Sequence, residues 1–420
     1  MTVSLVRGTR RSWLLLLCTW LLVIASIVTW RRGVIFDGGF DLVVVGKAGV
    51  AALALGVSAI LYLTSTSRRT VGGVSVTLVA FIIAISAIGA LAGGNPVPTA
   101  VLVVRMAILA ATIMLLVSAH NSRTILTTLL TAMAGVGLLS AATGFLTETS
   151  DDRLFGGIPP LQPNELAALI LPPLVSVVYL ITAQGLNWWN GPTGCLLLWI
   201  VYETGSRTGL AVGAAAAVLV LVCAPSVSRT MAVLATLAIP VAFSVVAFTD
   251  LLVATFARGE DETRLLTLNS RTVAWDAVLQ TPVDTWRWWI GAGLALKVVP
   301  VAAQYRDEQV LDSSWISAIA QSGAIGTLLL GIWVLLTVKN ALRRTKLRPI
   351  VLPLVALVLV RSLLENGLIE SSVTFMLFFT LALLSESGTE SLRHALGKKL
   401  VPDLSLPALI RLERVGPSRD

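Results

Sequence analysis

Arg207 stands where its side chain could bind a diphosphate group. It follows Ser206 within residues 203–210, directly before an apolar run rich in alanine and valine. If that run is a helix, its first N–H groups and its macrodipole favour an anion, and the guanidinium adds a charged hydrogen-bond donor. The alternative interpretation is an arginine that anchors the end of a membrane span by extending its charge to the interface.

The polar, tryptophan-rich stretch at residues 257–315 carries further candidates. Arg271 and Trp275 are spaced i, i+4 behind Ser270, a suitable N-cap, so they share one face of a predicted helix. Such a pair suits a charged sugar donor, and a helix lying on the lipid headgroups is an equal alternative. Asp312 stands at the mouth of the next apolar segment, where it could act on a hydroxyl group or only cap a helix.

Charged residues also interrupt an apolar region near the C-terminus. Arg361 and Glu365 are spaced i, i+4, and Glu370 follows them. Opposite charges usually pair when they lie inside a membrane-embedded bundle. We therefore predict a structural pairing of Arg361 with Glu365.

The elements that position these residues are predicted to be membrane-spanning helices. Of the 420 residues, 56% are hydrophobic and 13% charged, which lies outside the range of soluble domains. Because one crossing needs roughly 20 mostly apolar residues, about twelve segments qualify. They cover residues 13–30, 42–63, 74–91, 100–117, 124–146, 165–182, 187–202, 207–223, 231–256, 315–338, 350–364 and 371–384.

We expect an all-α polytopic membrane bundle with one large extracytoplasmic loop between spans nine and ten. Residues 1–256 would supply the first nine spans, residues 257–314 the loop with short helices, and residues 315–386 the last three spans. Residues 387–420 would form a cytoplasmic tail. The segment 339–349 carries five basic residues and no acidic one, so the positive-inside rule places it and both termini in the cytoplasm. The predicted location is the cytoplasmic (inner) membrane.

Nucleic-acid binding and metal binding are not indicated. The formal net charge of +8 arises from basic residues in short inter-span loops, where the positive-inside rule puts them. Cys18, Cys195 and Cys223 lie in or beside apolar segments without metal-ligand spacing. The acidic run at residues 260–262 is interpreted as solvated loop, so we expect no metal.

Taken in order, the motifs of the second half resemble the O-antigen ligase and O-antigen polymerase superfamily of bacterial membrane glycosyltransferases. The similarity includes a Pro-Asn segment, a Ser-Arg motif, the start and end of a large outer loop, and a final segment with a Gly-x-x-Gly pattern. These matches fall at residues 162–165, 204–210, 271–275, 291–293 and 312–326, with Pro282 inside the loop. Residues 1–146 are similar only in being apolar spans.

The resemblance implies transfer of a glycan from polyprenyl diphosphate to an acceptor hydroxyl outside the membrane, without metal or other cofactor. It implies that Arg207 and Arg271 neutralise the departing diphosphate and that Asp312 orients or deprotonates the acceptor. It assigns substrate binding to four residues. They are Asn164, Ser206, Trp275 and Ser313.

The chain departs from the family pattern where the ligases carry histidine and asparagine. Asp312 and Ser313 stand there, and both histidines, His120 and His394, are predicted to be cytoplasmic. This difference favours a polymerase over a ligase. The expected partners are the lipid-linked donor, the glycan acceptor, the bilayer and other polysaccharide-assembly membrane proteins. A transporter or lipid-linked sugar flippase that uses Lys47, Arg105 and Arg361 is the alternative from another class.

Overall fold

The computed structural model describes residues 2–31, 41–65, 68–94, 96–147, 153–229, 231, 269–303, 306–343 and 347–386. Three predictions fall mainly or wholly outside these ranges. They concern the ninth span at 231–256, the acidic run at 260–262 and the tail at 387–420.

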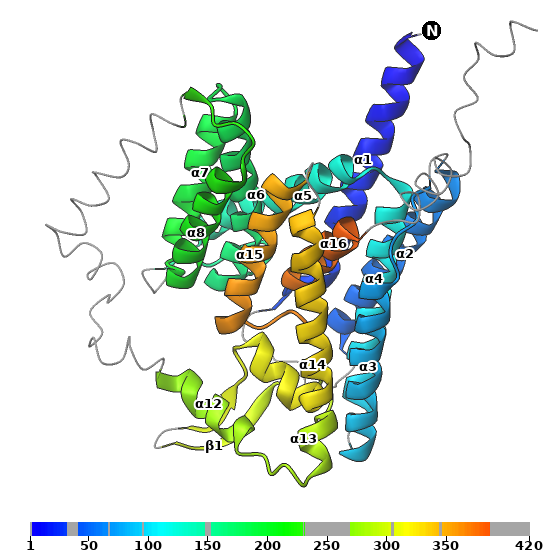
Figure 1. The fold of residues 1–420 in the computed structure, drawn as a ribbon, viewed down its shortest axis with the longest axis vertical. Helices are drawn as coiled ribbons and strands as arrows, with labels where there is room; N and C mark the ends of the chain where they lie inside the picture. Colours follow the sequence, from blue (N-terminus) through cyan, green and yellow to red (C-terminus); the bar gives the residue numbers. More distant parts are fainter. Residues whose placement is uncertain are drawn as a thin grey trace, which may run out of the picture.

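The described part of the chain is mostly helical (Figure 1). Its first half contains α1 (Thr2–Ile27), α2 (Leu42–Thr64), α3 (Val74–Ala92), α4 (Pro96–Ala119), α5 (Ser122–Phe145), α6 (Pro163–Gln184), α7 (Asn190–Glu203) and α8 (Arg207–Cys223). The second half contains α12 (Asn269–Leu279), α13 (Trp286–Ile290), β1 (Val298–Ala303), β2 (Arg306–Val310), α14 (Ser314–Arg343), α15 (Arg348–Leu364) and α16 (Val373–Ser385).

A helical membrane bundle is confirmed in its general form. Within the described ranges, six helices are long and apolar enough to cross a membrane, namely α2, α3, α4, α5, α6 and α14. Three further apolar helices are shorter, at Ser12–Ile27, Arg207–Cys223 and Val373–Ser385. The total of twelve crossings stays a prediction. Residues 269–314 include two short helices, as expected, but also the antiparallel hairpin β1–β2, which was not expected.

The short helix α16 lies in the middle of the bundle. Every residue from Phe375 to Ser385 is buried, as expected for a helix that is apolar on all sides. Trp333 of α14 packs edge-on against Phe378. The surrounding helices contact one another in the closed order α1, α2, α4, α3, α14, α15, α8, α6, α5. With 13 residues, α16 is about 20 Å long, shorter than the roughly 30 Å hydrocarbon core.

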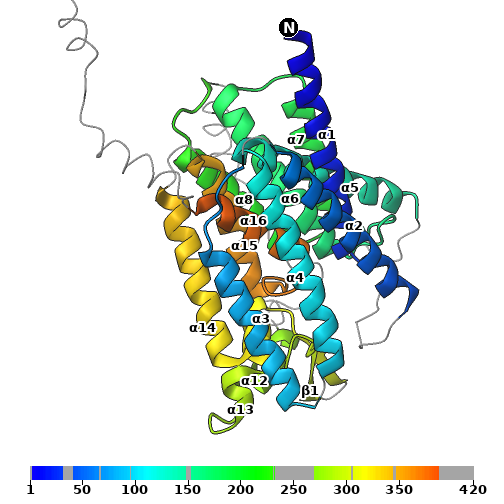
Figure 2. The ribbon, with the colours of Figure 1, turned by 90° about the vertical axis from the view of Figure 1, so that its right-hand side faces the viewer.

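The hairpin, α12 and α13 gather at the end of the molecule opposite the start of α1 (Figures 1 and 2). The ends of α14 and α15 that join each other lie toward the other end (Figure 1). The polar second-half segments therefore cover one end of the bundle, next to the loop between α15 and α16.

Two glycine segments of the second half meet in space. Gly323 interrupts α14 with φ of 67°, and Gly291 ends α13 with φ of 71°. A Cβ atom at Gly323 would lie 2.3 Å from the carbonyl carbon of Trp289. The N–H of Gly293 donates to the carbonyl of Gln321 at 3.0 Å. The close backbone contact between α13 and the break in α14 requires glycine at these positions.

We predict that Gly323→Ala destabilises the fold, because alanine adds both left-handed strain and a clash with Trp289. The expected loss in the free energy of unfolding is about 2–4 kcal/mol. Gly331→Ala in the same helix is the matched control, since no atom lies within 4 Å of its Cβ position. Thermal unfolding of the purified full chain in detergent would measure both. Equal melting temperatures for the two variants would contradict the prediction.

Candidate functional site

A large cavity lies where α15 ends and α16 begins. Its volume is about 580 Å³, within the range of ordinary small-molecule sites. Apolar residues at the end of α1 and the start of α6 form part of its wall. The charged residues that line it are Glu165, Lys297, Asp312, Arg361, Glu365 and Glu370.

The hairpin brings Asp312 to this cavity. Val298 and Val310 are paired in the antiparallel ladder, and the N–H of Leu311 donates to the carbonyl of Lys297 at 3.0 Å. The chain therefore leaves β2 beside the residue that precedes β1. Asp312 is half-buried and lines the cavity two residues before α14 begins.

The loop at residues 365–372 closes the cavity from the other side and is tied to the start of α14. The hydroxyl of Ser314 donates to the carbonyl of Glu365 at 2.8 Å and accepts from the N–H of Leu368 at 3.2 Å. The next residue makes a second link: the indole N–H of Trp315 donates to the hydroxyl of Ser362, near the end of α15, at 3.1 Å. These bonds fix the distance between the Asp312 segment and the end of α15.

Glu370 is held in this loop by an ion pair with Lys297. Gln321 donates to its carboxylate at 3.3 Å, and Asn366 donates as well. Burial raises the pKa of Glu370. The charge of Lys297 and the hydrogen bonds from Lys297, Gln321 and Asn366 lower it by more than burial raises it, so this pKa lies below its ordinary value. Lys297 and Glu370 thus join the hairpin to the bundle.

We predict that acidification weakens the fold through Glu370. Its folded pKa is depressed, so its contribution is complete above the unfolded pKa of about 4.3 and is lost as the pH falls through the folded value. Lys297→Met should lower the free energy of unfolding at pH 7 by about 1–3 kcal/mol, between typical exposed and buried pairs. It should also make the free energy of unfolding depend less on acid pH. Without Lys297, less of the upward effect of burial on the pKa of Glu370 is offset, so the folded pKa lies closer to the unfolded one.

Melting temperatures recorded between pH 7 and pH 3 would test this prediction, with Lys339→Met as the control for loss of a lysine. Lys339 is exposed in α14 and lies outside the cavity lining. An unchanged acid dependence in Lys297→Met would show that the ion pair does not set the protonation of Glu370.

Asn164 joins three helices at the edge of the cavity. Its amide nitrogen donates to Glu365 at 2.9 Å, and its side-chain oxygen accepts from Arg153 at 3.3 Å. Its backbone carbonyl accepts from Arg361 at 3.0 Å. Arg153 also donates to the carbonyl of Thr204 at 3.1 Å. The starts of α6 and α8 and the end of α15 are therefore joined by polar contacts.

The start of α8 has the helix-cap geometry expected from the sequence. The hydroxyl of Ser206 accepts from the N–H of Gly209 at 3.2 Å, and Ser206 is buried. Arg207 is the first residue of α8 and is half-buried. Neither residue belongs to the cavity lining. Thr204, three residues before Arg207, is nevertheless connected to the cavity, because Arg153 donates both to Thr204 and to Asn164.

Arg271 and Trp275 lie on α12, outside the cavity lining. The side chain of Arg271 is outside the described part. Trp275 packs against an apolar cluster that includes Val299 of the hairpin and Leu311. Its position anchors α12 to the hairpin, and no described residue accepts a hydrogen bond from its buried indole nitrogen. Its predicted role under a sugar ring remains a prediction.

The remaining predicted residues are distributed as follows. Ser313 is buried, and its carbonyl accepts the N–H of Ser317 at 2.8 Å in the first turn of α14. Arg361 and Glu365 both contact Asn164, and the charge of Glu365 acts on Arg361. The structure thus brings Asn164, Asp312, Arg361 and Glu365 to one cavity.

Three residues at or beside this cavity were not singled out from the sequence. Arg153 and Asn366 lie in short polar segments between apolar ones, and Lys297 is a single charge within an apolar run. The signal for Lys297 was its isolation, because it is the only charged residue between 288 and 305.

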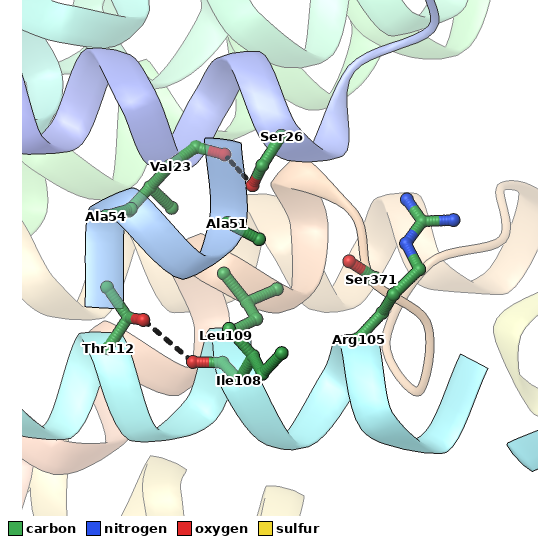
Figure 3. A pocket seen from close by; sticks show the side chains of 9 residues that line it. All are labelled: Val23, Ser26, Ala51, Ala54, Arg105, Ile108, Leu109, Thr112 and Ser371. Carbon is green, nitrogen blue, oxygen red and sulfur yellow. Dashed lines mark hydrogen bonds between the residues drawn. The ribbon is translucent and has the colours of Figure 1, made fainter. Parts of the chain in front are cut away.

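A second, much smaller pocket lies between α1, α2 and α4 (Figure 3). Figure 3 shows the guanidinium of Arg105 extending past Ser371, away from the apolar side chains of Ala51 and Leu109. The charges of Arg105 and Glu165 act on Lys47. The pocket volume of about 10 Å³ corresponds to about one water molecule, so this pocket is too small for a sugar.

No protein-family model matches the sequence, and no curated protein matches it.

Proposed function

We propose that the chain is an O-antigen-polymerase-like glycosyltransferase. It moves a glycan from polyprenyl diphosphate to an acceptor sugar hydroxyl at the outer face of the cytoplasmic membrane. The observation that carries this proposal is the 580 Å³ cavity of a membrane-embedded bundle. Asp312 and Asn164 both line it, together with carboxylates of the kind that bind sugar hydroxyls.

The proposed reaction needs a base for the acceptor and positive charge for the leaving group. The acceptor oxygen attacks the anomeric carbon while Asp312 takes its proton. The bond between that carbon and the diphosphate oxygen breaks, and its electron pair leaves with the diphosphate. Arg207 and Arg271 are proposed to neutralise the charge that develops there. Neither residue lines the cavity, so the proposal requires the diphosphate to extend beyond the cavity toward the starts of α8 and α12. The donor already contains the energy of the reaction, so no nucleotide is needed.

The proposal includes a topology of twelve crossings with both termini in the cytoplasm. The segment at residues 231–256 would supply the ninth crossing, and the loop at 257–314 would lie outside. The clustering of α12, α13 and the hairpin at the end opposite the start of α1 supports this arrangement (Figure 1). In this proposed topology, Asp312 and the cavity would lie on the outer side.

Two experiments test the proposal. Purified protein in nanodiscs, supplied with a polyprenyl-diphosphate-linked repeat unit, should produce longer glycans and release polyprenyl diphosphate. A strain that lacks the chain should accumulate lipid-linked single units; accumulation of long lipid-linked chains would instead identify a ligase. Movement of the lipid-linked sugar between leaflets without lengthening would replace the proposal with a flippase.

A further inference from the structure

One nitrogen of Arg361 has no hydrogen-bond partner among the residues that the structure describes. The residue is 4% exposed and lines the large cavity. Its Nη2 donates to the carbonyl of Asn164 at 3.0 Å, whereas Nη1 is buried and has no partner among the described residues. An unsatisfied charged donor at such a site is costly. Nη1 itself has almost no accessible surface, so an acceptor that enters the cavity would reach it once the guanidinium turns toward the cavity, away from the balancing charge of Glu365.

The N-terminus of α16 meets the same cavity. Ser372, Val373 and Thr374 all line it. The hydroxyl of Ser372 accepts from the N–H of Phe375 at 3.1 Å. The N–H groups before it, at Val373 and Thr374, are the first of the helix and therefore have no intrahelical acceptor. The positive end of the helix dipole therefore faces the space that Arg361 lines, and both favour an anion.

The loop before α16 contacts the first turn of this helix through Gly367. Gly367 has φ of 135°, and a Cβ atom there would lie 2.8 Å from the hydroxyl oxygen of Ser372. The same hydroxyl donates to the carbonyl of Gly367 at 2.7 Å. Because glycine allows this close contact, the loop crosses beside the first turn of α16.

The acids in the lining interact with groups other than Nη1 of Arg361. Glu370 pairs with Lys297, and Glu365 accepts from Asn164. Glu165 accepts from the hydroxyl of Thr29 at 3.0 Å and from the N–H of Gln162 at 3.1 Å. The fourth, Asp312, belongs to the segment where α14 begins, whereas α16 begins beside Gly367. None of the hydrogen bonds identified for these acids involves Nη1 of Arg361.

We propose that Arg361 and the N-terminus of α16 form a binding position for a phosphate or diphosphate group. Nη1 of Arg361 and the first N–H groups of α16 would donate to its oxygens. This position is additional to Arg207 and Arg271. That the phosphate is carried on a polyprenyl lipid rests on the proposed function; the binding of the anion does not.

Calorimetric titration of the purified full chain in detergent tests the proposal, with inorganic diphosphate and polyprenyl diphosphate as the two probes. Arg361→Gln removes the charge and keeps a donor for the carbonyl of Asn164. Arg348→Gln is the matched control, because Arg348 is exposed at the opposite end of the same helix. We expect saturable binding by the unaltered protein and by Arg348→Gln, and binding at least about tenfold weaker by Arg361→Gln.

A second measurement uses the unaltered protein alone, so that a folding defect in Arg361→Gln cannot decide the result. Diphosphate should raise its melting temperature in a saturable way, and sodium chloride at equal ionic strength should not. Much tighter binding of polyprenyl diphosphate would identify a lipid headgroup as the source, and equal affinities a free anion. Either result supports the site.

Two outcomes would overturn the proposal: no saturable binding of either probe, or equal affinity for Arg361→Gln and Arg348→Gln. If glycan lengthening is observed but either of these outcomes occurs, only the phosphate position is wrong. If Arg361 controls diphosphate binding but no lengthening is observed, the proposed function fails and the phosphate position stands.

Discussion

Asp312→Asn is expected to reduce the rate of glycan lengthening by about 10²–10⁴-fold, the usual contribution of a general acid or base. Asparagine has nearly the same shape, and Asp312 precedes Ser313, whose carbonyl accepts the first hydrogen bond of α14, so the fold and the abundance of the protein should be unchanged. Asp312 lines the cavity between the hairpin and α14, where the proposed acceptor hydroxyl would bind. The rate with a lipid-linked repeat unit in nanodiscs is the measurement.

Asp284→Asn is the control for this experiment. Asp284 is exposed in the segment between α12 and α13 and lies outside the cavity lining, so its removal should leave the rate unchanged. If Asp312→Asn retains the full rate, Asp312 is not the base, and the proposed chemistry loses the group that takes the acceptor proton.

The positions of the helices could be predicted because each depends on a local property of the sequence. A run of apolar residues is enough to indicate a buried or lipid-facing helix. Accordingly, every predicted span that lies in the described ranges corresponds to a helix, including the short α7 at Asn190–Glu203. The position of Asp312 at the mouth of α14 follows from the same local reasoning.

The cavity itself could not be predicted, because it depends on contacts between distant residues. Lys297 and Glu370 are separated by 73 residues yet form an ion pair, and Asn164 contacts Arg361 and Glu365 across more than 190 residues. The sequence indicated an Arg361–Glu365 pairing from spacing alone, but not that Asn164 contacts both. It also gave no sign that the first residues of α16 would line a cavity inside the bundle.

The hairpin shows the same limit on a smaller scale. The segment 298–310 contains proline and a run of charged residues, neither of which favours a strand. Its pairing is supported by Val299, which packs with Ala274 and Val278 of α12 in one apolar cluster. Tertiary packing therefore determines the strand pairing here, and only a structure could reveal it.

Arg207→Ala is expected to reduce glycan lengthening by about 10²–10³-fold, the range found when one donor to a developing oxyanion is removed. Arg207 is the first residue of α8, where alanine is well tolerated, so folding should be preserved. Arg287→Ala is the control, because Arg287 is an exposed arginine of α13 outside the cavity lining. It should keep the full rate.

Arg207→Lys separates the two interpretations of this residue. If Arg207 only anchors a span at the interface, lysine should replace it without loss, since its charge reaches the headgroups equally well. If Arg207 binds the leaving diphosphate with two parallel hydrogen bonds, lysine keeps the charge but loses the planar donor pair, and the rate should fall to an intermediate value. A full rate for both Arg207→Ala and Arg207→Lys would remove Arg207 from the site. The positive charge near the cavity would then come from Lys297 and Arg361.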